Sequence, residues 1–134
     1  MSAVEAMLRG RRLAESLMRS MCTITRAGTG PRVFDEATGT YTDPPRVPVY
    51  VGRCKVQDAD RTASEAEAGD REAGVVGLSL HLPIDGSGGV ARDDVAVIDS
   101  NPDDPALVGR RFVVRAPHDG TLKTARRLPV EAVV

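Results

Sequence analysis

The residues best suited to acid–base chemistry are the two histidines, His81 and His118. Neither has a serine or cysteine beside it in a recognisable nucleophile setting. We interpret His81 as part of a strand and His118 as part of a Pro-His-Asp-Gly turn. The sequence therefore does not indicate an enzyme, and only a pocket that gathered a histidine with several carboxylates would change this interpretation.

One stretch begins like a calcium-binding loop. Asp99, Asn101 and Asp103 have the D-x-N-x-D spacing that supplies oxygen ligands. The sixth position of such a loop requires glycine and the twelfth requires glutamate, but here they are Asp104 and Arg110. We interpret the stretch as a turn between strands and expect no metal site.

Three other patterns also have simpler structural interpretations. Residues 86–89 are glycine-rich but lack the lysine of a phosphate-binding loop, and Asp93-Asp94 resembles a turn more than a catalytic carboxylate pair. Cys22 and Cys54 match no metal-binding spacing, so we expect buried free thiols in strands. No cofactor is expected.

The charged residues are better suited to contacts than to catalysis. Two arginine pairs, 110–111 and 126–127, lie at predicted strand edges and could bind phosphate or carboxylates of a neighbouring subunit, or be ordinary exposed arginines. Residues 57–74 contain no apolar side chain larger than alanine and predict a long loop. This acidic segment holds six acids and two arginines, a net charge of −4; the acids are Asp58, Asp60, Glu65, Glu67, Asp70 and Glu72.

The N-terminal residues 1–20 have helical spacing. Ser2 and Glu5 fit a capping box, and apolar residues recur at steps of three and four. We expect one apolar face packed against a sheet with arginines outside, although such a helix could also bind a membrane or a partner. The apolar residues are Val4, Met7, Leu8, Leu13, Leu17, Met18 and Met21.

The rest of the chain has the short apolar runs and turn residues of strands. Residues 21–26, 47–56, 75–83, 95–98, 112–114 and 128–130 predict strands, and residues 33–41 predict a hairpin whose corner needs Gly39. We expect a bulge at Gly52, and prolines limit the hairpin region to a sheet edge. The chain, residues 1–134, is thus expected to be one domain: a mainly β, small antiparallel barrel of six or seven strands (21–134) with one helix.

Composition narrows the function classes further. The formal net charge is −1 and aromatic residues make up 3% of the chain, which argues against a nucleic-acid-binding barrel. The charged N-terminus fits neither a signal peptide nor a membrane span, so we expect a cytosolic protein or part of an assembled particle.

Several segments, in order along the chain, resemble a family of small neck proteins of tailed phages and prophages of actinobacteria, the head-closure or head-to-tail stopper proteins. The resemblance is carried by residues 14–18, 22–26, 50–57, 80–83, 92–95, 104–112 and 124–128. It implies a virion protein that is present in the host cytoplasm during assembly. It also implies a small barrel that forms a ring between the portal-adaptor complex and the tail terminator or tail tube.

In the resembled family, a long loop closes the central channel after DNA packaging. Carried onto this sequence, the resemblance makes the acidic segment the candidate gate, with the hairpin at 33–41 as second choice for a lumen-facing or docking element. The segment lacks bulky plugging residues, but repetition around a ring would multiply its negative field. Assembly would use edge strands and arginine–carboxylate contacts; the candidate contact residues are Arg53, Arg110, Arg111, Arg126 and Arg127.

Two other interpretations stay open. The chain could be another neck or tail component, namely an adaptor, a tail terminator or a minor tail protein, all of which can be small, β-rich and ring-forming. It could also be a small barrel that binds nucleic acid, although its charge and its four stacking residues argue against this.

Overall fold

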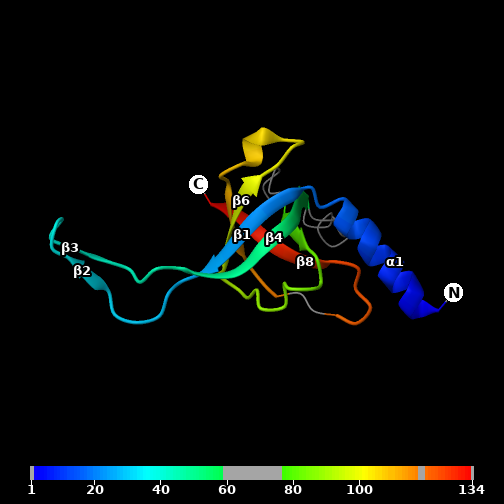
Figure 1. Ribbon diagram of the computed structural model, residues 1–134, viewed down its shortest axis with the longest axis horizontal. Helices are drawn as coiled ribbons and strands as arrows, with labels where there is room; N and C mark the ends of the chain where they lie inside the picture. Colours follow the sequence, from blue (N-terminus) through cyan, green and yellow to red (C-terminus); the bar gives the residue numbers. More distant parts are fainter. Residues whose placement is uncertain (1, 59–76, 118–119, 134) are drawn as a thin grey trace, which may run out of the picture.

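A closed antiparallel barrel of six strands forms the centre of the protein in the computed structural model, which describes residues 2–58, 77–117 and 120–133 (Figure 1). The elements in chain order are α1 (Ala3–Ser16), β1 (Ser20–Arg26), β2 (Val33–Asp35), β3 (Thr40–Thr42), β4 (Val47–Asp58), β5 (Leu78–Leu82), β6 (Val95–Ser100), the 3-10 turn η1 (Pro105–Leu107), β7 (Arg111–Val114) and β8 (Arg126–Val133). The barrel order is β1-β4-β5-β8-β7-β6, and β6 closes it by pairing with β1. The expected mainly β barrel with a single N-terminal helix is confirmed.

The core is the barrel interior, and every barrel strand contributes two side chains to it. Strand residues alternate between the two faces of a sheet, so β1 points Cys22 and Ile24 inward and Thr23 outward. The interior is mostly aliphatic, as the low aromatic content predicts. Its members are Cys22, Ile24, Tyr50, Cys54, Leu80, Leu82, Val90, Ala96, Ile98, Phe112, Val114, Leu128 and Val130.

The predicted bulge at Gly52 is wrong, because the irregularity lies three residues earlier. Ile24 pairs with Tyr50 and the next residue of β1 pairs with Pro48, so Val49 is the extra residue of β4. Gly52 keeps regular pairing with Cys22. It is glycine for a different reason: a Cβ atom there would lie 2.7 Å from the hydroxyl oxygen of Tyr50.

Among the described residues, closure of the barrel leaves edge strands only in the two-stranded β2–β3 sheet, so assembly through edge strands stays a prediction. Each of the six strands has a hydrogen-bonded neighbour on both sides, so the barrel offers no free ladder for pairing. The β2–β3 hairpin lies outside the barrel, and we call residues 32–43 the arm. The arm confirms the hairpin predicted at 33–41, with Gly39 at its corner in a left-handed conformation (φ +70°).

Helix α1 is shorter than predicted, and its apolar face is not packed on the sheet. The capping box between Ser2 and Glu5 is confirmed, but no residue of the helix is buried. The helix meets the barrel along a narrow line, where Gly10 allows close approach to Thr124 and Arg11 Nε donates to the Lys123 carbonyl at 3.0 Å. Val4, Leu8, Leu13, Leu17 and Met21 are therefore exposed, while Met18 is buried after the helix ends.

Candidate functional site

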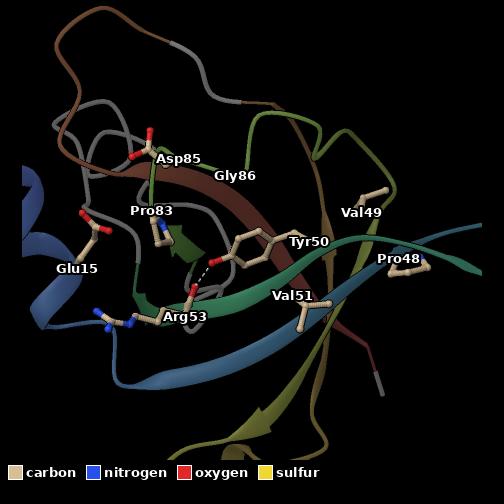
Figure 2. Close-up of a pocket in the computed structure, with 9 residues that line it drawn as sticks. All are labelled: Glu15, Pro48, Val49, Tyr50, Val51, Arg53, Pro83, Asp85 and Gly86. Carbon is tan, nitrogen blue, oxygen red and sulfur yellow. Dashed lines mark hydrogen bonds between the residues drawn. The ribbon is translucent and has the colours of Figure 1, made fainter.

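A shallow groove of about 580 Å³ lies between the barrel wall and the end of the helix (Figure 2). Strand β4 forms its floor, the turn after β5 forms one wall, and α1 reaches it through Glu15. Its lining residues are Glu15, Pro48, Val49, Tyr50, Val51, Arg53, Pro83, Asp85 and Gly86.

Tyr50 is the residue that shapes this groove. Its ring belongs to the barrel core, and its hydroxyl donates a hydrogen bond of 2.7 Å to the Arg53 carbonyl (Figure 2). Burial raises the pKa of the Tyr50 hydroxyl well above its ordinary value. A tyrosine held protonated in this way is a structural hydrogen-bond donor near neutral pH.

The candidate gate falls mostly on residues that the structure does not describe. Asp58 is exposed at the end of β4, where it pairs with Leu78 of β5. Asp60, Glu65, Glu67, Asp70 and Glu72 lie outside the described residues. The acidic segment thus leaves the barrel from the β4–β5 pair, and its role as a gate stays a prediction.

The five candidate contact arginines occupy different environments. Arg53, Arg110, Arg111 and Arg127 are exposed on the barrel surface and are open to a partner. Arg126 is half-buried and donates from Nε to Ser87 Oγ at 2.9 Å. Ser87 in turn donates to the Pro83 carbonyl, so Arg126 fixes the 83–87 turn on β8 and is the least suited of the five to a partner.

The polar side chains that resembled chemical motifs instead make structural hydrogen bonds. Asn101 Oδ1 accepts the backbone N–H groups of Asp103 and Asp104, each at 2.9 Å, which confirms the turn interpretation of the calcium-like stretch. Asp94 is buried and receives two hydrogen bonds from the Arg26 guanidinium, at 2.9 and 3.0 Å. This pair fastens the end of β1 to the start of β6.

The two cysteines and His81 are buried in the barrel. Cys22 and Cys54 are free thiols in the core, as expected. Contact with the Cys54 thiol, with burial, raises the pKa of Cys22 above its ordinary value, so Cys22 is an inert thiol rather than a nucleophile. His81 lies in β5 between Lys55 and Arg127 of the neighbouring strands, and His118 is outside the described residues.

Two exposed apolar surfaces lie outside the barrel. On the arm, Phe34 and Tyr41 are 50% and 62% exposed, and their ring centroids are 5.1 Å apart. On α1, Leu13 and Leu17 are 64% and 53% exposed. The sequence patterns located these residues but not their exposure; a signal was available for the arm, because a three-residue strand pair leaves its aromatics with little to pack on.

No described helix is long and apolar enough to span a membrane. Among the described residues, no group of three or more metal-ligating side chains comes together.

Comparison with known proteins identifies a family but no activity. Residues 10–131 match the family described as "Family of unknown function (DUF6093)". No curated protein matches the chain. The solution structure of protein SF1141 from Shigella flexneri 2a is similar with a TM-score of 0.55 and 14% identity, over 86% of this chain and 92% of that chain. At this identity the similarity supports the fold alone.

Proposed function

We propose that this chain, which belongs to the DUF6093 family, is a structural phage neck protein of the head-closure or stopper type. In this role, copies form a ring between the portal-adaptor complex and the tail, retain packaged DNA and present the surface on which the tail docks. The observation that carries the proposal is the ordered resemblance of segments from residue 14 to residue 128, together with the small barrel that it implies.

The architecture suits a ring component. The barrel gives a stiff body whose ladder is complete, while the arm and α1 extend from it toward opposite ends of the molecule (Figure 1). Elements that leave a stiff body with their apolar side chains exposed are typical of chains that bury surface only on assembly. Four exposed arginines on the barrel supply donors for carboxylates of a neighbour.

The gate proposal rests on electrostatics. The acidic segment has a net charge of −4 and starts at the exposed Asp58, where β4 leaves the barrel wall. A ring would bring one copy of this charge from each subunit to the channel, and the summed field would repel DNA phosphates. In the proposed role the segment therefore holds DNA back without binding it and can be displaced during ejection.

Electron microscopy of lysates from a phage carrying a nonsense mutation in this gene tests the proposal. Empty or DNA-leaking heads beside complete, unattached tails support a stopper. Full, stable heads with missing or overlong tails would instead identify a tail terminator or another tail component, and normal particles would refute a neck role.

Complementation in trans separates the gate from the ring. A variant with all six acids of the segment changed to their amides should restore head–tail joining but leave heads that lose DNA. A control variant, D85N, changes an exposed acid in the turn after β5 and should restore both properties. Full DNA retention by the neutralised variant would refute the gate.

A further inference from the structure

Two uncovered apolar surfaces lie at opposite ends of the protein. Figure 1 shows the arm at one end of the longest axis and α1 at the other. On the arm, Val33, Phe34 and Tyr41 are 57%, 50% and 62% exposed, and Phe34 pairs directly with Tyr41. An isolated two-stranded hairpin is marginally stable in water, so these side chains would gain most from a partner that covers them.

The surface of α1 is built differently but is equally uncovered. Val4 and Leu8 are four residues apart and lie on one side of the helix, while Leu13 and Leu17, also four apart, lie on the opposite side. All four side chains are between 43% and 64% exposed. The line that meets the barrel, at Gly10 and its neighbours, uses neither pair.

The two surfaces also carry opposite charge. The arm contains three acids and one arginine, a net charge of −2. Helix α1 contains three arginines and two glutamates, a net charge of +1. Of these, Arg9 and Arg12 are exposed on the helix and Glu36 is exposed at the arm corner, so the charges are available to a partner.

We propose that the arm of one copy docks on helix α1 of the next copy. The contact joins an apolar, acidic hairpin to an apolar, basic helix, and two different surfaces meet, which makes the contact heterologous. Because the surfaces lie at opposite ends of each chain, a docked pair still presents one free arm on one copy and one free helix on the other. The contact therefore repeats from copy to copy and can close into a ring.

This inference deepens the proposed function, since it names the contact that would build the proposed ring. It is nevertheless testable without any phage. A contact of one hairpin with one short helix is small, so we expect weak association, with a dissociation constant of about 0.1–1 mM in isolation. The isolated protein would then be mostly monomeric at low micromolar concentration.

Sedimentation equilibrium from about 10 μM to 1 mM tests the contact with two surface variants. The arm variant is F34D/Y41D. The helix variant is L13Q/L17Q, which removes the more exposed apolar pair on one side of the helix and retains good helix formers. Wild type should grow beyond a dimer at high concentration, while each variant alone should stay monomeric. None of the four side chains is buried, so circular dichroism should show an unchanged fold.

Mixing the two variants gives the decisive measurement. The arm variant keeps an intact helix and the helix variant keeps an intact arm, so an equimolar mixture should form one-to-one dimers and nothing larger. V108Q, which changes a 48% exposed valine beside η1, is the matched control and should associate like wild type.

Three results would overturn the inference: a wild type that stays monomeric to 1 mM, a variant that alone associates like wild type, or a mixture that stays monomeric. Salt adds a further readout, because opposite charges at the contact require association to weaken as salt rises. Association that does not respond to salt would contradict the charge pairing. If the phage mutant shows the stopper phenotype but the purified wild-type protein stays monomeric, the arm–helix contact is refuted and the proposed function still stands.

Discussion

Replacing Gly52 by alanine should destabilise the protein, although the same change in an open strand position would stabilise it. Glycine inside a strand costs about 0.5–1 kcal/mol relative to alanine, because its unfolded chain has more freedom to lose. At Gly52 the new Cβ would lie 2.7 Å from Tyr50 Oη and 3.0 Å from Cζ. Overpacking of this kind costs about 1–3 kcal/mol.

Movement of the Tyr50 ring cannot relieve the clash without a further loss. The hydroxyl donates to the Arg53 carbonyl at 2.7 Å, and breaking this hydrogen bond costs about 1 kcal/mol. The unfavourable contributions exceed the gain in strand propensity, so we expect G52A to lower the free energy of unfolding by about 1–3 kcal/mol.

Urea denaturation of wild type, G52A and the matched variant G89A measures the effect. A Cβ at Gly89 would meet no atom within 4 Å, so G89A should be neutral or slightly stabilising. In a Y50L background the extra methyl group has more room, and G52A should cost less there than in wild type. The reasoning is refuted if G52A is as stable as wild type, or if its cost is the same with tyrosine and with leucine at position 50.

Two further outcomes are expected for stability. Folding raises the pKa of both Cys22 and Tyr50, so as pH rises the unfolded chain loses these protons before the folded protein does. The resulting stabilisation is fully present below the ordinary thiol pKa of about 8.5 and is lost as pH rises above it. Urea midpoints at about pH 7.5 and 10 should show this fall, and a C22A/Y50F variant should show less of it. R26M leaves the buried Asp94 carboxylate without its guanidinium and should lower the thermal midpoint, whereas R32M breaks a pair of exposed side chains and should shift it by no more than about 1 °C. Equal shifts for R26M and R32M would contradict the role of the Arg26–Asp94 pair.

The barrel was predictable because its information is local. In β1 apolar and polar residues alternate, which predicts the side chains that point inward, and turn residues such as Gly39 indicate where the chain reverses. The bulge was not predictable in this way. It depends on how Tyr50 and Pro48 align with β1, and that alignment is a property of two strands rather than of one.

The surfaces outside the barrel were predictable in position but not in environment. Helical periodicity correctly places Leu8 and Leu13 on a helix, but an apolar side chain with that spacing is equally compatible with a covered or an uncovered face. Whether this face is covered depends on the contact of α1 with Lys123 and Thr124, which lie far along the chain. The acidic segment illustrates the opposite case, because its composition predicts a loop while leaving its task open.

The pairing of Asp58 with Leu78 means that the connection between β4 and β5 begins and ends at two adjacent residues. The strands hold those ends together, and one cost that depends on the length of the connection is the entropy of closing a loop. That entropy changes slowly with length, and doubling the connection costs about 0.6 kcal/mol. The register of the barrel at this point is therefore held by the pairing of β4 with β5 itself.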